Sequence, residues 1–172
     1  MSVLTILQYP NPRLRIIAKP INIINKEIKI LVSNMLDTMY VKEGIGLAAT
    51  QVNVQLQVIV VNTNQIKKEH LILINPEIIE KKGNISIEEG CLSIPEYRAF
   101  IPRSDYIKVK AINLSGKEIE IEAKSILSIC IQHEIDHLKG KLFIDYLSSL
   151  KKERIKKKLK KQIKKMKYFE RI

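Results

Sequence analysis

The clearest hydrophobic pattern in this chain is helical and covers residues 26–41. Apolar side chains recur there at steps of three or four residues, at Ile28, Leu31, Val32, Met35, Leu36 and Met39. Because this spacing places them along one side of a helix, it predicts an amphipathic α-helix with one face packed on a core. Two glycines, Gly44 and Gly46, follow this segment and are expected to end it.

Strand-like patterns fill the middle of the chain. Short β-branched runs or alternating apolar and polar positions predict four strands, at residues 57–61, 71–74, 106–113 and 118–123. We expect Asn75 and Pro76 to end the second of these strands, and Gly116 to lie in a turn that joins the last two as a hairpin. Residues 85–87 also alternate and lead into a loop that contains Cys91.

Two more helices are predicted toward the C-terminal end. Ser125 is a suitable N-cap for a helix that runs through His137 and stops near Gly140, and another helix covers residues 148–167. The opening segment contains three prolines and should be extended, with at most one short turn near residues 11–15. Helices that flank a central group of strands, without regular βαβ alternation, indicate an α+β fold.

Composition sets limits on size and location. A chain of 172 residues, 45% hydrophobic and 28% charged, has the length of one domain that buries its own core. Its two cysteines, Cys91 and Cys130, are too few for a disulfide framework. The first residues lack the pattern of a signal peptide, and no apolar run approaches the roughly 20 residues of a membrane span. We therefore expect a cytoplasmic protein with no membrane partner.

The net charge of +12 is concentrated at the C-terminal end. Residues 151–172 hold twelve Lys and Arg and two Glu, so this segment carries +10 and the rest carries +2. We therefore divide the chain into a nearly neutral body, residues 1–147, and a basic amphipathic tail, residues 148–172. Apolar residues recur along one face of the helix expected in the tail, at Leu147, Leu150, Ile155, Leu159, Ile163 and Met166.

The basic tail has two main interpretations. It is either a solvated, charged helix docked on the body or a surface for nucleic-acid phosphates, which a lysine stripe binds in a salt-dependent way. A membrane-surface helix is less favoured, because the tail has no Trp and little bulky apolar surface.

The most informative motif is His133-Glu134-Ile135-Asp136-His137, which holds two of the three histidines in the chain. On a helix the two imidazoles lie on one face, about 5–6 Å apart at Cβ, and can bind one metal ion. A thiolate from Cys91 would complete three ligands and leave a fourth position open, as catalysis requires. Each residue also has a structural explanation, as a packed histidine, a small buried cysteine or a solvated carboxylate.

Three segments closely resemble the signature motifs of peptide deformylases, in that family's order and spacing: residues 44–51 (Gly-Ile-Gly-Leu-Ala-Ala-Thr-Gln), 89–93 (Glu-Gly-Cys-Leu-Ser) and 132–137 (Gln-His-Glu-Ile-Asp-His). The resemblance extends from the first residues to about residue 150. It implies hydrolytic removal of the N-formyl group from the N-terminal methionine of nascent proteins, with release of formate. It also implies small mixed or antiparallel sheets packed around the helix of the His-Glu-x-x-His motif, with a further helix at the C-terminus.

The resemblance assigns the metal and the proton transfer to four residues. Cys91, His133 and His137 would bind one divalent ion, Fe²⁺ in the first place, with Zn²⁺, Ni²⁺ or Co²⁺ able to replace it. Metal-bound water would attack the formyl carbonyl, with Glu134 as general base and then general acid.

Further catalytic and binding roles come from the same resemblance. The Gln51 side-chain amide and the Leu92 backbone N–H would donate hydrogen bonds to the formyl oxygen as it gains negative charge. Gly46 is placed with these catalytic residues. Together with Gly44 and Ile45, it would border the site and pair with the substrate backbone as with an added strand.

A specificity pocket is expected beside the first histidine of the motif. Ile126, Ile129 and Cys130 precede it by seven, four and three residues, and all three lie within about 60° of it around the helix. They are either an apolar wall next to the metal or ordinary core. By resemblance they line the methionine pocket together with Ile45 and Ile87.

Four charged residues are expected around this pocket, again by resemblance. Arg98 would contact the substrate backbone. Glu89, Arg103 and Asp136 are candidates for an ion-pair network that fixes the ligands and the loops around them.

The resemblance also favours one partner for the tail. Deformylase substrates emerge from ribosomes, and the C-terminal helix of similar bacterial enzymes docks near the exit tunnel. We therefore predict that residues 148–172 bind ribosomal RNA.

Two other functions remain as alternatives. The chain could be another small metallohydrolase, such as a metallopeptidase, which would cut unformylated peptides. It could also be a nucleic-acid-binding module with a structural metal, but this needs a closed site with four ligands, and the sequence offers no fourth.

Overall fold

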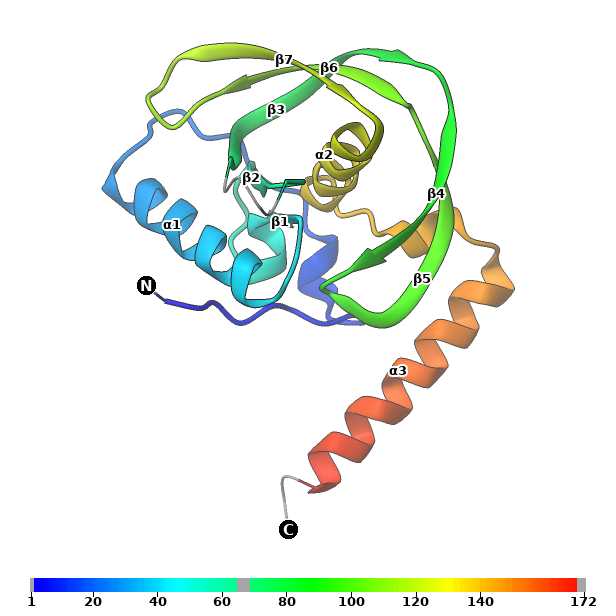
Figure 1. Cartoon of the computed structure of the whole chain (residues 1–172). Coiled ribbons are helices and arrows are strands. Elements are labelled where there is room, and N and C mark those ends of the chain that lie inside the picture. The colour runs from blue at the N-terminus through cyan, green and yellow to red at the C-terminus, as the bar shows by residue number, and fades with distance from the viewer. Residues whose placement is uncertain (1, 65–68, 170–172) are drawn as a thin grey trace.

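A single helix lies at the centre of the fold, and two antiparallel sheets pass around it (Figure 1). The computed structural model describes residues 2–64 and 69–169, with the backbone alone for residue 160 and residues 162–169. Its helices are α1 (Lys26–Val41), α2 (Ser125–Leu138) and α3 (Ser149–Phe169), and its short 3₁₀ turns are η1 (Pro12–Arg15), η2 (Ala49–Val52) and η3 (Phe143–Tyr146). The central helix is α2.

The larger sheet has five strands in the order β1 (Gly46–Ala48), β2 (Val58–Val61), β3 (Leu71–Lys82), β6 (Tyr106–Ile112) and β7 (Glu118–Lys124). The smaller sheet is a hairpin of β4 (Ile85–Cys91) and β5 (Ile94–Arg103). All these pairings are antiparallel. The α+β expectation is therefore confirmed.

Strand β2 shows how one segment joins two cores. All four of its residues are buried. Because side chains alternate along a strand, Ile59 and Val61 enter the core that α2 also forms, whereas Val58 and Val60 enter the core that α1 forms. A strand that is covered on both faces needs apolar side chains at every position, and this is why residues 58–61 are all apolar.

The amphipathic pattern predicts the position of α1 correctly. The helix covers residues 26–41, and the Asn25 side chain caps it by accepting a hydrogen bond from the backbone N–H of Ile28 at 3.0 Å. Val32, Met35 and Met39 are fully buried against β2 and its neighbours. The apolar face therefore packs on the sheet, as its spacing requires.

The expectation that Asn75 and Pro76 end a strand is wrong, because β3 continues to Lys82. The register shifts between Ile74 and Glu77, so the pair forms a bulge rather than a stop. Asn75 adopts a positive φ of 50° there, and its side chain makes two hydrogen bonds to the backbone of Ile21. A local polar anchor thus lets the strand bend and go on.

Two other sequence predictions need correction. Strand β5 was not predicted, because it contains Pro95 and Pro102, but a strand in a two-stranded hairpin has a free edge that tolerates proline. Consequently Cys91 is the last residue of a strand rather than part of a loop. Ser125 is the first residue of α2, and Lys124 occupies the N-cap, because β7 runs directly into the helix.

Helix α3 leaves the body and extends away from it (Figure 1). Its attachment is a small cluster in which Leu159, 5% exposed, and the partly buried Ile155 pack near Ile94. Leu150, which the sequence places on the same face, is 63% exposed and so does not take part in this cluster. The side chains of Ile163 and Met166 lie outside the described residues.

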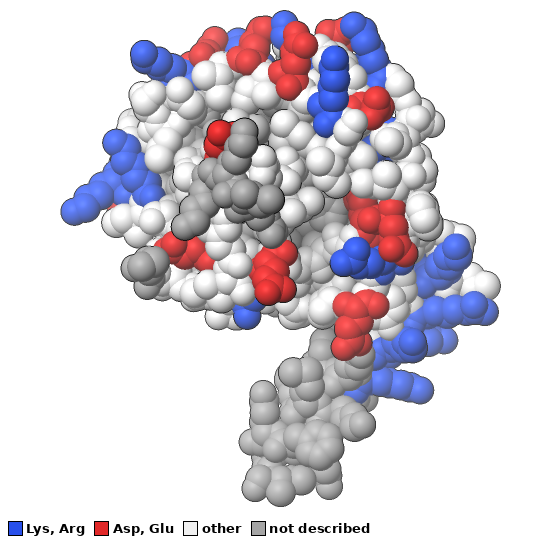
Figure 2. Space-filling model, in the orientation of Figure 1, with Lys and Arg blue, Asp and Glu red and all other residues white. Residues whose placement is uncertain are grey.

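Positive charge gathers on the described part of α3 (Figure 2). Figure 2 shows lysine and arginine side chains projecting from this helix, while acidic and basic residues are interspersed on the visible face of the body. No helix within the described ranges has the length and apolar character needed to cross a membrane.

Candidate metal centre

Helix α2 and strand β4 bring three potential metal ligands together. His133 and His137 lie one turn apart on α2 with their Nε2 atoms 3.2 Å apart, and the Sγ of Cys91 lies 3.2 Å from Nε2 of His137. These three atoms lie within 4.8 Å of one another. Both histidines are buried, and Cys91 is partly buried.

The chemistry of these three atoms fits a single divalent cation. His133 donates its Nδ1–H to Oε2 of Glu89 at 2.8 Å, so its Nε2 presents a lone pair toward the other two ligands. Ligands of a tetrahedral site with metal–ligand bonds of about 2.0–2.3 Å lie roughly 3–4 Å apart. The two distances from Nε2 of His137, both 3.2 Å, fall in that range. A thiolate and two imidazoles are a donor set that Fe²⁺, Zn²⁺, Ni²⁺ and Co²⁺ all accept.

An ion-pair network contacts His133 through its Nδ1 atom. The Arg103 guanidinium donates to both oxygens of Glu89, at 2.6 and 3.0 Å, and to Oδ2 of Asp136 at 2.6 Å. Burial alone would raise the pKa of Glu89, but hydrogen bonds from His133 and Arg103 outweigh it and lower that pKa. Glu89 therefore stays ionised and keeps the imidazole oriented, and these charged residues lie together as the sequence suggested.

Glu134 lies on the same helix with one carboxylate oxygen unsatisfied. Its side chain is buried, and Oε2 has no hydrogen-bond partner among the described residues. Burial raises the pKa of Glu134 to about 7. A buried carboxylate with a free oxygen and a pKa near neutrality is suited to take up and release a proton.

Position 46 has no room for a side chain, because Gly46 lies against Glu134 and Cys130. A Cβ at this position would lie 2.5 Å from Oε1 of Glu134 and 2.7 Å from Sγ of Cys130. Any side chain here would therefore push the carboxylate aside. The neighbouring Gly44 is similarly tight, because its Cβ would lie 2.8 Å from Cδ1 of Leu92.

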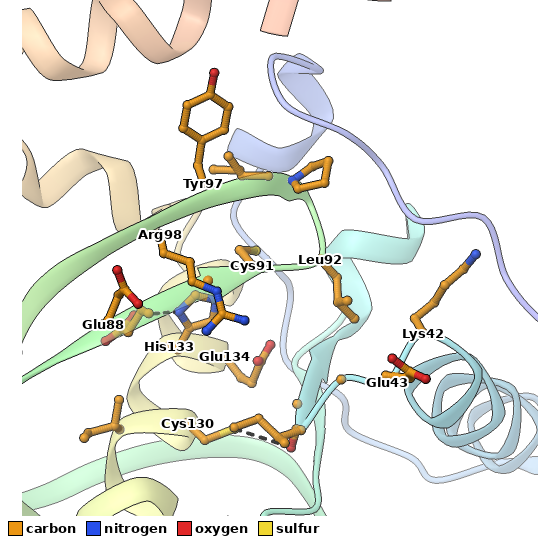
Figure 3. A pocket seen from close by; sticks show the side chains of 18 of the residues that line it. Lys42, Glu43, Glu88, Cys91, Leu92, Tyr97, Arg98, Cys130, His133 and Glu134 are labelled. Carbon is orange, nitrogen blue, oxygen red and sulfur yellow. Dashed lines mark hydrogen bonds and ion pairs between the residues drawn. The ribbon is translucent and has the colours of Figure 1, made fainter. Parts of the chain in front are cut away.

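A cavity of about 790 Å³ is lined by both Glu134 and Cys91 (Figure 3). In Figure 3, Cys130, His133 and Glu134 project from α2, and Cys91, Leu92 and Arg98 come from the side of the β4–β5 hairpin. Most of the residues singled out from the sequence line it: Gly44, Ile45, Gly46, Gln51, Ile87, Glu89, Cys91, Leu92, Arg98, Ile126, Ile129, Cys130, His133 and Glu134. His137, Arg103 and Asp136 are not part of this lining.

The Gln51 amide is oriented by its surroundings. Its Oε1 accepts a hydrogen bond from the backbone N–H of Ala48 at 2.8 Å, so its NH₂ group faces the opposite way. That group lies 3.6 Å from Sγ of Cys91 and 3.2 Å from Oγ of Ser93. A fixed amide donor therefore lies beside the candidate metal ligand.

Sequence reasoning missed several residues of this centre. Ser93 donates its backbone N–H to Sγ of Cys91 at 3.4 Å, and the Phe143 ring stacks on His133 with 6.5 Å between ring centres. Tyr146 donates to Asp136, and Glu88 and Tyr97 line the cavity. The position of Ser93, two residues after the cysteine, was a usable signal. The others come from segments with no recognisable motif.

Comparisons with known proteins agree with this geometry. The family model described as polypeptide deformylase matches residues 3–153. A peptide deformylase of Buchnera aphidicola from Acyrthosiphon pisum is 70% identical over 98% of both chains, and one from Schizaphis graminum is 72% identical over 92% of this chain and 95% of the other.

Solved structures of lower identity share the fold. A peptide deformylase from Legionella pneumophila superposes with a TM-score of 0.91, at 41% identity over 97% of this chain and 98% of the other. One from Ehrlichia chaffeensis in complex with actinonin gives 0.88, at 37% identity over 94% and 98%. This chain therefore belongs to the polypeptide deformylase family, hydrolases that remove the N-formyl group from the N-terminal methionine of nascent peptides.

Proposed function

We propose that this enzyme performs deformylation at the centre formed by Cys91, His133 and His137, with Glu134 as the group that moves protons. The observation that carries this proposal is the convergence of three metal-binding atoms next to a buried carboxylate with an unsatisfied oxygen. Buried polar atoms are normally paired within a protein, so the unsatisfied Oε2 of Glu134 favours a role in chemistry over one in packing.

We propose Fe²⁺ as the native ion, on the resemblance to deformylases, with Zn²⁺, Ni²⁺ and Co²⁺ able to take its place. When bound, such a cation supplies Lewis acidity and lowers the pKa of water toward neutrality. Cys91 and the two histidines would hold it, and Glu89, Arg103 and Asp136 would keep the histidine ring in the orientation that binding requires.

Glu134 carries the proton through the reaction in this proposal. It accepts a proton from the attacking water as the new C–O bond forms at the formyl carbon. When the C–N bond breaks, it delivers that proton to the leaving nitrogen, so that formate and a free amino terminus result. The pKa near 7 lets one carboxyl serve in both directions.

The formyl oxygen gains negative charge during this attack, and two N–H donors would stabilise it. We propose the Gln51 amide and the backbone N–H of Leu92. Donors in such positions typically contribute about 10²–10³ in rate each. Support for Gln51 comes from the hydrogen bond with Ala48, which turns its NH₂ group toward Cys91.

The substrate would lie along the cavity as an extra strand beside Gly44–Gly46 and the edge of β4. The methionine side chain would enter the apolar part of the cavity, which is lined by Ile45, Ile87, Ile126, Ile129 and Cys130. Arg98, which also lines the cavity, would contact the substrate backbone. A Cβ at Gly46 would meet both Glu134 and Cys130, so this strand has no room for a side chain at that position.

A metallopeptidase is the second reaction that this donor set could support. The two reactions are separated by incubating the metal-loaded enzyme with formyl-Met-Ala-Ser and with Met-Ala-Ser. We expect formate from the first peptide, with Met-Ala-Ser left intact as product, and no cleavage of the second. Cleavage of Met-Ala-Ser without formate release would favour the peptidase.

We further propose that the tail, residues 148–172, binds ribosomal RNA and that the enzyme acts in the cytoplasm, where formylated chains emerge. Support comes from the lysine and arginine side chains on the described part of α3, which leaves the body and is reachable by a large partner (Figures 1 and 2).

A further inference from the structure

The ion-pair network behind His133 continues beyond Asp136 to a tyrosine on η3. The Tyr146 hydroxyl donates to Oδ2 of Asp136 at 2.8 Å, and Arg103 Nη1 reaches the same oxygen at 2.6 Å. Arg103 Nη1 also donates to the Tyr146 hydroxyl at 3.3 Å. The three atoms form a closed triangle of hydrogen bonds, in which each group fixes the other two.

The Tyr146 ring adds a second contact to the same guanidinium. Arg103 Cζ lies 4.9 Å from the ring centre, a distance at which a cation is attracted to the face of an aromatic ring. The Arg103 side chain is 3% exposed and that of Asp136 is 14% exposed, whereas Tyr146 is 43% exposed. Tyr146 is therefore the outermost member of the network and separates its charges from water.

A continuous chain of hydrogen bonds leads from this triangle to the metal ligand. Arg103 uses Nε and Nη2 for Glu89, and Glu89 accepts from Nδ1 of His133. Two carboxylates thus share one guanidinium. The Tyr146 hydroxyl gives Asp136 a second donor on the oxygen that Arg103 Nη1 also reaches, while Nε and Nη2 of Arg103 bind Glu89.

We propose that Tyr146 is a positioning residue for the metal ligand His133, acting through Asp136, Arg103 and Glu89. The inference rests on the proposed metal centre. Burial and the nearby Asp136 carboxylate raise the pKa of Tyr146 to about 12, so its hydroxyl keeps its proton and remains a donor at neutral pH. The same turn also carries Phe143, which stacks on His133. Turn η3 therefore contacts the imidazole directly through Phe143 and is linked to it indirectly through Tyr146.

The test compares Tyr146→Phe, which keeps the ring and removes the hydroxyl, with the wild-type full chain. Metal-free protein is titrated with Co²⁺ against a competing chelator, and binding is followed by the thiolate-to-cobalt absorption. Partners of a ligand histidine typically contribute 10–100-fold to metal affinity, so for this residue, two groups further out, we expect Co²⁺ to bind about three- to tenfold more weakly. The absorption of the bound ion should also shift, because the geometry of His133 relaxes.

Tyr106→Phe is the matched control, because Tyr106 also has a cation over its ring, contributed by Lys82 or Lys124, but lies on β6 outside the network. It should bind Co²⁺ as the wild type does. The position of the absorption band reports only on folded protein that holds the ion, so a loss of stability in Tyr146→Phe does not obscure the result.

Two further variants separate this inference from the proposed function. If Glu89→Gln weakens Co²⁺ binding but Tyr146→Phe leaves both affinity and absorption unchanged, the role of Tyr146 is wrong and the metal centre stands. If Cys91→Ala binds Co²⁺ with the same affinity and spectrum as the wild type, the centre itself is wrong, and the role of Tyr146 is overturned with it.

Discussion

At the scale of single residues, the candidate metal centre is closely packed around one carboxylate. Glu134 is buried next to a backbone segment that has no side chain at Gly46. It lines the cavity, and its Oε2 has no hydrogen-bond partner among the described residues. The absence of a Cβ at Gly46 leaves the Glu134 carboxylate its space beside this strand. This arrangement leads to two predictions about individual side chains.

Replacing Glu134 by Gln should remove the proton carrier while keeping the size and the polarity of the side chain. Because general acid–base catalysis is typically worth about 10²–10⁴ in rate, we expect kcat to fall by about that factor. Metal content and the melting temperature should stay close to those of the wild type. Steady-state assays of formate release and metal analysis check both points, and an active Glu134→Gln enzyme would place the base elsewhere.

Gly46→Ala should disturb the same carboxylate without altering its chemistry. The added Cβ meets Glu134 and Cys130 at distances that require a shift, and overpacking of this kind typically costs about 1–3 kcal/mol. We expect a clear loss in kcat/KM. Gly90→Ala is the comparison, because a Cβ there meets its nearest neighbour at an ordinary 3.5 Å. Equal losses in the two variants would mean that the crowding around Glu134 is not the cause.

The candidate ligands could be found from the sequence because helix spacing is a local property. The i, i+4 positions of His133 and His137 guarantee a shared face, and the motif around Cys91 supplies the third atom. Tyr146 could not be found in this way. Its partners Asp136 and Arg103 come from α2 and β5, and only the folded chain brings the three together.

At the scale of secondary structure elements, the strands show what pattern reasoning can and cannot resolve. The three- to four-residue spacing of apolar residues predicted α1, and the alternation of apolar and polar residues predicted β6 and β7. The bulge in β3 and the whole of β5 were missed, because proline and asparagine end strands in general but are accommodated here by a polar anchor and by a free edge.

Asn75→Ala tests the anchor in β3. The variant loses two hydrogen bonds to the backbone of Ile21 and places alanine at a positive φ of 50°. Each lost hydrogen bond is worth about 0.5–1.5 kcal/mol, so we expect the free energy of unfolding to drop by roughly 1.5–4 kcal/mol with the added backbone strain. Urea unfolding measures this, with the exposed Asn84→Ala as a control that should remain near the wild type. Similar stabilities for both variants would refute the anchoring role.

At the scale of the whole molecule, a nearly neutral catalytic body carries a basic helix that extends away from it. Composition alone located the charge of this tail, because a run of lysines is visible without any folding. It could not reveal the docking of Leu159 and Ile155 near Ile94, which depends on a contact between distant segments. Removing the tail would therefore also cut into a hydrophobic cluster, and charge is better tested by substitution.

Replacing Lys151, Lys157 and Lys161 by Gln removes three exposed charges from α3 and leaves its apolar contacts in place. If the tail binds ribosomal RNA, affinity for purified ribosomes should fall, and the dependence of affinity on salt should become shallower, because fewer counterions are released. Activity on a short formylated peptide should not change. Lys29, Lys81 and Lys117 replaced by Gln form a control of equal charge on the body. Equal loss of ribosome binding in both triple variants would contradict a specific role for α3.

The most direct test of the account is the dependence of deformylation on the metal. The enzyme is purified without oxygen, stripped with a chelator and reloaded with one equivalent of Fe²⁺, Ni²⁺, Co²⁺ or Zn²⁺, and formate release from formyl-Met-Ala-Ser is followed throughout. We predict that activity disappears on stripping, returns with a single equivalent, is highest with Fe²⁺ or Ni²⁺, and is not restored in Cys91→Ala under the same conditions. Formate release that persists in the fully stripped enzyme would contradict the central claim that Cys91, His133 and His137 form the catalytic metal site.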